Sequence, residues 1–133
     1  MANLAKYQGE INLPDEGMEV IKIIYDFSND TGAVAAYNGF QAGHKMVVHK
    51  CIMKVQTACT SGGSATVSVG KTGSVAALAA ATAVASLTGD AIIAGVPSAG
   101  GVLLAAGDYV LFDIAVAALT AGKIEATLFV EKF

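Results

Sequence analysis

Hydrophobic and polar residues alternate in three long segments of this chain, the pattern of β-strands with one buried face. The first segment begins at Val20, the second runs from Met46 to Thr57, and the third runs from Lys123 to Glu131. Their apolar members are Ile21, Ile23, Tyr25 and Phe27 in the first, Val47, Cys51, Met53 and Val55 in the second, and Ile124, Ala126, Leu128 and Val130 in the third. The alternation therefore predicts three half-buried strands.

Shorter apolar runs between turn-forming residues predict further strands. We expect them at Ala33 to Phe40, interrupted near Asn38-Gly39, and at Ala65 to Gly70, Ala91 to Val96, Val102 to Leu104 and Tyr109 to Val116. Glycine and small polar residues predict turns at Ser28 to Gly32, Thr60 to Ser64 and Leu119 to Gly122. Seven or eight short strands at roughly ten-residue spacing predict an all-β fold, an antiparallel β-sandwich. We expect a jelly-roll-like topology, although the strand order is left open.

One segment favours a helix. Ser74 to Ala85 is rich in alanine, the residue of highest helix propensity, and Ser74 can cap the first turn. We therefore expect one short helix of one to three turns across the end of a sheet.

The first nineteen residues differ from the rest. Residues Met1 to Glu19 contain four carboxylates with little periodicity, which favours an extended N-terminal arm that becomes ordered against a neighbour. A frayed terminus without function is the alternative. The expected organisation is an arm at 1–19 and a β-sandwich domain at 20–133. The arm residues expected to make contacts are Leu4, Tyr7, Ile11, Leu13 and Pro14.

The composition indicates a surface that other chains cover. Only 14% of residues are charged and 54% are hydrophobic, whereas soluble domains average about 25% and 45–50%. Exposed apolar area of this kind marks interfaces, so we expect a homo-oligomer; the alternative is a monomer with alanine and glycine at its surface. The net charge is −3 and the chain has no arginine, which argues against nucleic acid and anionic membranes as partners. The N-terminus lacks the apolar stretch of a secretory signal, so we expect an intracellular product.

No residue pattern indicates catalysis. Ala65 to Thr72 matches a relaxed phosphate-binding loop ending in Gly70-Lys71-Thr72, but strand-forming residues fill its spacer and Gly73 follows where a helix should continue. His44 and His49 lie on opposite faces of an extended segment, so they cannot jointly bind a metal. Cys51 and Cys59 are expected to be reduced, partly buried thiols. We therefore expect no enzyme, no catalytic residue, no metal site and no cofactor.

Several segments resemble small structural proteins of tailed-bacteriophage virions. They are Ile24-Tyr25-Asp26-Phe27, Val47-Val48-His49, Thr57 to Gly70, the alanine-rich stretch after it, Leu87-Thr88-Gly89-Asp90 and Ala117 to Lys123. The resemblance covers most of the chain after Val20, and its motifs consist mainly of small residues and turns. It implies a capsid decoration (cement) protein or a related head or head-fibre component, commonly a trimeric jelly roll, and it brings no catalytic residue.

The resemblance sets the functional expectation. We expect a virion structural protein that binds the major capsid protein, or another virion protein, as a homo-oligomer, with a trimer expected. Its location would be the outer capsid surface, after assembly in the host cytoplasm. The main alternative is a tail or head-fibre module for host adhesion or receptor binding; a hydrolase or NTPase on a β scaffold, dependent on Lys71, is a weaker one.

Overall fold

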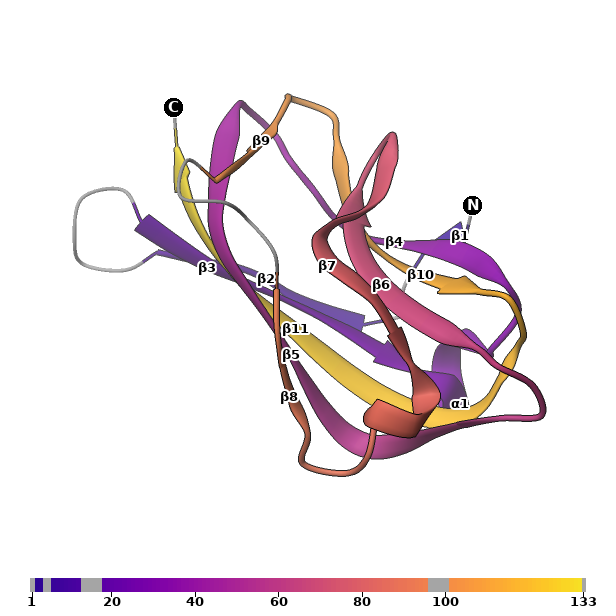
Figure 1. Cartoon of the computed structure of the whole chain (residues 1–133). Coiled ribbons are helices and arrows are strands. Elements are labelled where there is room, and N and C mark those ends of the chain that lie inside the picture. The colour runs from indigo at the N-terminus through magenta and orange to yellow at the C-terminus, as the bar shows by residue number, and fades with distance from the viewer. Residues whose placement is uncertain (1, 4–5, 13–17, 96–100, 133) are drawn as a thin grey trace.

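The computed structural model describes residues 2–3, 6–12, 18–95 and 101–132, and they form two β-sheets packed face to face (Figure 1). The five-stranded sheet has the order β1 (Ala2–Asn3), β4 (Ala35–Gln41), β10 (Tyr109–Ala115), β6 (Thr66–Lys71) and β7 (Ser74–Ala83). The six-stranded sheet has the order β2 (Lys6–Asn12), β3 (Met18–Asp26), β11 (Leu119–Lys132), β5 (Met46–Ser61) and β8 (Ile92–Ala94), and β9 (Val102–Leu104) also pairs with β5. All pairings are antiparallel except that of β1 with β4. The all-β antiparallel sandwich is therefore confirmed.

The strand pairing is nested, as in a jelly roll. β3 pairs with β11, β4 with β10, β5 with β8 and β9, and β6 with β7. Successive pairs alternate between the two sheets, so the chain behaves as one long hairpin rolled into a sandwich. This order confirms the expected jelly-roll topology, which the sequence pattern had left without a strand order.

The core lies between the sheets and contains the apolar residues of the three alternating segments. Ile21 and Ile23 of β3, Leu128 of β11 and Met53 of β5 are fully buried there. Tyr25 of β3 packs against the five-stranded sheet, with ring centroids 5.7 Å from Tyr37 and 6.3 Å from Phe112. Burying each such side chain contributes about 1.5–3 kcal/mol, so this layer is the main source of stability.

The expected helix at Ser74 to Ala85 is wrong. Ser74–Ala83 forms strand β7, which pairs with β6, and a 3-10 turn, η1 (Val84–Ser86), follows it. Leu78 and Ala79 are fully buried, and β6 is buried along most of its length. Pairing with β6 thus outweighs the helix propensity of alanine, because a helix of this length is only marginally stable unless it packs against the rest of the protein. The short helix is instead α1 (Phe27–Asp30), which Asp26 caps by accepting a hydrogen bond from the Ser28 N–H.

The turn expected at Leu119 to Gly122 is also wrong, because β11 already begins at Leu119. Its first residues pair irregularly with β5, with register shifts on both sides of Ala121. Gly122 has φ 142°, and a Cβ there would lie 2.6 Å from the Cys59 sulfur. The turn-like composition therefore corresponds to a bulged strand that passes close to β5.

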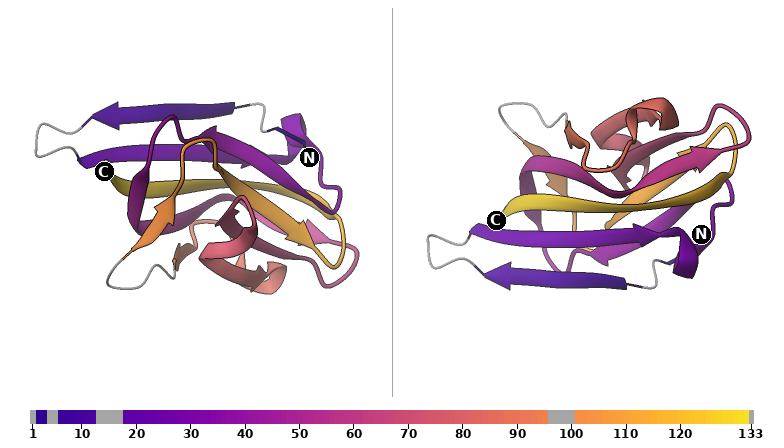
Figure 2. Two further views of the ribbon diagram at one scale, coloured as in Figure 1. Left: turned by 90° about the horizontal axis from the view of Figure 1, so that it is seen from above. Right: turned by 90° about the horizontal axis from the view of Figure 1, so that it is seen from below.

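The N-terminal residues add a strand at the edge of the six-stranded sheet. β2 pairs with β3, Tyr7 opposite Ile23 and Ile11 opposite Val20, and Figure 2 shows β2 as the outermost strand beside β3. The expected boundary at residue 19 falls within β3, and the division into arm and domain stays a prediction. No helix within the described ranges is long and apolar enough to cross a membrane.

Candidate interaction surfaces

The residues that resembled a phosphate-binding loop form a strand and a tight turn. β6 ends at Lys71, and the chain returns through Gly73, at φ 86°, into β7 rather than into a helix. A Cβ on Gly70 would lie 2.2 Å from the Val75 carbonyl carbon, so the backbone of β7 lies directly against Gly70. The Lys71 ammonium donates a hydrogen bond to the Leu103 carbonyl at 3.1 Å. Lys71 therefore joins the end of β6 to β9 and faces no phosphate cradle.

The histidines and cysteines are not gathered into a reactive site. The His49 Nε2 lies 2.9 Å from Glu131 Oε1, whereas the His44 ring contacts the Lys45 carbonyl. Within the described ranges, no group of three potential metal ligands is found. Cys51 and Cys59 are free and buried, as expected. Burial raises the pKa of the Cys51 thiol to about 12 and that of Cys59 to about 11, so both are protonated and poorly nucleophilic at neutral pH.

The five contact residues expected in the arm are only partly described. Leu4, Leu13 and Pro14 lie outside the described residues. Tyr7 and Ile11 belong to β2, whose backbone is one edge of the six-stranded sheet. Their role in binding a neighbour stays a prediction.

One end of the sandwich presents exposed apolar side chains on well-anchored loops. Val34 and Val116 are 55% and 74% exposed. Val116 has φ 73° and Thr31 has φ 63°, conformations that are unfavourable for β-branched residues. Strain of this kind persists only where the surrounding structure imposes it.

Two core tyrosines and a glycine hold these loops in place. Tyr25 donates a hydrogen bond to the Thr31 carbonyl at 2.6 Å, and Tyr37 donates one to the Ala33 carbonyl at 2.7 Å. Burial raises the pKa of Tyr25, so this hydroxyl remains a donor at high pH. A Cβ on Gly32 would lie 2.0 Å from the Leu119 carbonyl oxygen, and the Leu119 N–H donates to the Gly32 carbonyl at 2.8 Å. The apolar tip around Val34 and Val116 is thus rigidly presented.

Strand β7 is an edge strand without charge. It pairs with β6 on one side and is the last strand of its sheet. From Thr72 to Gly89 no residue is charged, and Val75, Ala76, Ala80 and Ala81 are exposed. Natural edge strands are normally protected by lysine, proline or strong bulges, because unpaired N–H and C=O groups invite another strand. β7 has two register shifts against β6, one between Ser74 and Ala79 and one between Ala79 and Thr82, so irregular pairing is the protection that this edge has.

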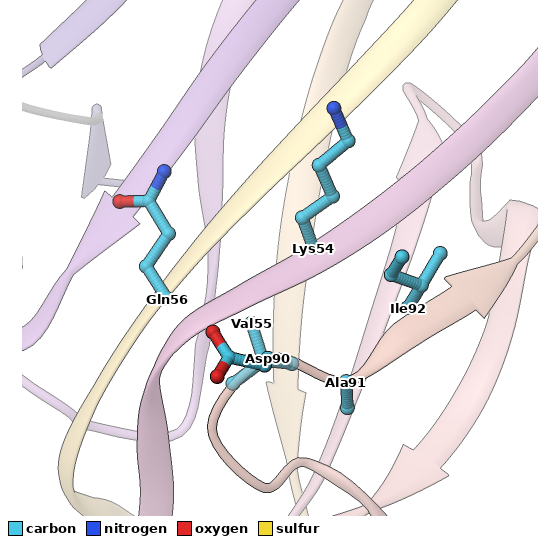
Figure 3. A pocket seen from close by; sticks show the side chains of 6 residues that line it. All are labelled: Lys54, Val55, Gln56, Asp90, Ala91 and Ile92. Carbon is cyan, nitrogen blue, oxygen red and sulfur yellow. The ribbon is translucent and has the colours of Figure 1, made fainter.

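A shallow depression lies where β5 meets the loop before β8. Its volume is about 370 Å³, and Lys54, Gln56, Asp90 and Ile92 contribute to its lining, together with Val55 and Ala91. Figure 3 shows Lys54 and Gln56 extending from the same side of β5. Ile92 is 71% exposed and pairs with Lys54 across the strands, so it belongs to the outer face of the six-stranded sheet. The sequence placed Ile92 in a strand, but only the register identifies its face.

The fold is similar to chains from three bacteriophage capsids. A chain of the cyanophage Pam1 capsid asymmetric unit matches with a TM-score of 0.62 and 17% identity over 95% of each chain. A chain of the acid-stable capsid of Helicobacter pylori bacteriophage KHP30 matches with a TM-score of 0.60 and 13% identity over 95% of this chain and 91% of that one. A chain of the capsid of Ralstonia phage GP4 matches with a TM-score of 0.59 and 19% identity over 92% and 90%.

These similarities concern the fold, and they agree with the resemblance to phage virion proteins seen in the sequence. No protein-family model and no curated protein sequence matches the chain.

Proposed function

We propose that this protein is a capsid decoration protein of a tailed bacteriophage, without enzymatic activity, that binds the outer shell as a homo-oligomer. The observation that carries the proposal is the fold shared with chains of three phage capsids, over at least 90% of each of those chains. The low charge of the whole chain and the exposed apolar residues at its surface support a protein that works in contact with others.

The proposed action is stabilisation by added contact area. A protein that binds the assembled shell, and not its separated subunits, shifts the equilibrium towards the intact particle by mass action. Many copies, each burying an interface of standard size or less, contribute together. The uncharged edge of β7 and the apolar tip around Val34 and Val116 are suited to contacts between neighbouring copies, and a trimer is the expected assembly.

Addition of the purified protein to shells that lack it tests the function. We expect the protein to sediment with the shells at a saturating ratio and to raise the temperature at which they release their genome. The matched control is an unrelated shell. Failure to bind, together with binding of the isolated protein to host cells, would replace this proposal with the host-adhesion function.

The oligomer is tested by light scattering on the isolated chain. Lysine on an edge strand opposes strand addition, so Ala81→Lys in β7 is expected to shift the protein towards the monomer. Ala58→Lys, at an exposed position of β5 in the other sheet, is the charge-matched control. A monodisperse single chain in the wild type at high concentration would contradict the expected trimer.

The arm is tested by deletion of residues 1–17, which removes β1 and β2 but leaves β3 whole. If the arm contacts the shell or an adjacent copy, this deletion lowers occupancy on shells while the remaining sandwich stays folded. Unchanged occupancy would remove the arm from the mechanism.

A further inference from the structure

Four lysines extend from one face of the molecule, the outer surface of β3, β11 and β5. We call this surface the lysine face and define it by Lys22, Lys50, Lys54 and Lys123. The register places Lys22 opposite Thr127, Lys54 opposite Glu125 and Lys50 opposite Phe129. Residues directly opposite in an antiparallel pair share a face, and the alternate residues Ile21, Ile23, Met53 and Leu128 are buried in the core. Half of the chain's eight lysines therefore project from one sheet surface.

Among the residues that the structure describes, no lysine of this face takes part in an ion pair. One ion pair joins His49 to Glu131 and another joins Lys132 to Glu19, and neither includes a lysine of this face. Two of the three carboxylates on the same face already have partners. Asp26 accepts hydrogen bonds from the Ser28 N–H and the Asn29 side chain, and Glu131 contacts His49. In the register Glu125 lies opposite Lys54 and Asp26 lies opposite Lys123, so four lysines against three carboxylates leave the lysine face with a net charge of +1.

The distribution of charge distinguishes this face from the rest of the chain. The face has four lysines and three carboxylates, whereas the remaining residues have four lysines and eight carboxylates. A net-negative protein that leaves unpaired lysines on one flat sheet has a charge pattern suited to a partner of opposite sign at that sheet.

Apolar side chains lie among the lysines. Phe129 packs beneath the Lys50 ammonium, 6.0 Å from ring centroid to nitrogen, and Ile24 and Ile52 are half-buried on the same face. Ile92 extends this apolar area to the sheet edge. Thr127 is 5% exposed, its register position lies between Lys22 and Ile52, and its buried hydroxyl oxygen has no hydrogen-bond partner.

These observations select one kind of partner. Two copies of the lysine face would repel each other, which disfavours a symmetric contact between copies through this surface. Glu125 in the centre and the apolar side chains around it are unsuited to a phosphate backbone, which is bound through extended basic surfaces. A protein surface that combines carboxylates with apolar residues matches both the lysines and the apolar side chains of the lysine face.

We propose that the lysine face docks onto a carboxylate-rich surface of a different protein. This inference rests on the proposed function, in which that protein is the capsid shell beneath. Strand β2 borders the lysine face through β3, so the arm and the face can contact the same partner. The uncharged β7 edge belongs to the other sheet and remains available to neighbouring copies.

The test compares two charge-matched variants on shells that lack the protein. Lys50→Gln/Lys54→Gln removes two cations from the lysine face, and Lys45→Gln/Lys71→Gln removes two from elsewhere, one from the loop before β5 and one from the end of β6. We expect the first variant to bind about tenfold more weakly and with less salt dependence, and the control to bind like the wild type. Thermal unfolding of each isolated variant verifies that it is folded.

Carbodiimide cross-linking of decorated particles identifies the partner directly, because it joins a lysine to a carboxylate in contact with it. Cross-links from Lys50 or Lys54 to a shell carboxylate support the proposal. Cross-links from these lysines to another copy of this chain, or equal binding by both variants, would overturn it while leaving decoration intact. Retention of the isolated protein on DNA, lost in Lys50→Gln/Lys54→Gln, would also overturn it. Absence of wild-type binding to any shell would instead contradict the proposed function.

Discussion

Val116 adopts a backbone conformation that its own side chain disfavours. It lies in the turn between β10 and β11 with φ 73° and an exposed side chain, so little packing compensates for the strain. A β-branched residue in this region costs on the order of 1–2 kcal/mol relative to its preferred conformations. The loops at this end of the sandwich impose the conformation through the contacts of Gly32, Leu119 and Tyr25.

Val116→Gly is therefore expected to stabilise the fold by about 1 kcal/mol, since glycine adopts positive φ without steric cost. Val34→Gly is the control, because Val34 is also exposed and apolar but has no positive φ. That change is expected to destabilise by about 0.5–1 kcal/mol through greater freedom of the unfolded chain. Urea unfolding of both variants measures the difference. A loss of stability in Val116→Gly equal to that in Val34→Gly would show that the turn is unstrained.

Glu19 is a second residue whose environment makes a prediction. Its side chain is 1% exposed, and its carboxylate lies 3.1 Å from the Lys132 ammonium without hydrogen-bond geometry. Lys132→Met keeps the aliphatic part of the side chain but leaves the buried Glu19 carboxylate without its cation. We therefore expect the free energy of unfolding to fall by about 1–3 kcal/mol. This is less than for a fully buried pair, because the Lys132 side chain is 45% exposed. Glu19→Gln/Lys132→Met should recover part of that loss. A double-mutant cycle by urea unfolding measures the coupling, and a coupling near zero would mean that solvent already screens the pair.

Strands with one buried and one exposed face could be predicted from the sequence, because hydrophobic and polar residues alternate along them as buried and exposed positions do. β3, β5 and β11 were located in this way, apart from their ends. β7 was not, because alanine carries little signal of burial and its intrinsic preference is helical, whereas the partner β6 determines its state. The interaction surfaces were less predictable still. The lysines of β3, β5 and β11 are visible in the sequence, but only the register between these distant strands brings them onto one face.

The strand character of β7 predicts the sign of one substitution. Ala80 is exposed, so replacing it mainly changes backbone preference. Ala80→Thr is expected to be neutral or to stabilise by up to about 0.5 kcal/mol in a strand, whereas it would destabilise a helix by about 0.5 kcal/mol. Ala58→Thr at an exposed position of β5 is the matched control and should change stability in the same direction. Opposite signs in the two urea-unfolding experiments would argue against the strand.

At the scale of the whole molecule, most strand pairing is between segments distant in sequence, although β2 with β3 and β6 with β7 are pairs of consecutive strands. β3 pairs with β11 and β4 with β10, across most of the chain. Chains dominated by such non-local contacts fold slowly, because loop closure precedes the gain from pairing. We expect refolding from urea in milliseconds to seconds or slower, measured by stopped-flow far-UV circular dichroism at low protein concentration. Refolding within microseconds would show that local structure directs folding.

The place of β11 between β3 and β5 also has a consequence for biosynthesis. This strand is translated after every other described strand, so the two sides of its sheet cannot join until the ribosome has made it. Until then the edges of β3 and β5 that will pair with β11 are unpaired, and unpaired strand edges invite premature association. The six-stranded sheet of a newly synthesised copy is therefore complete only after β11 has been added.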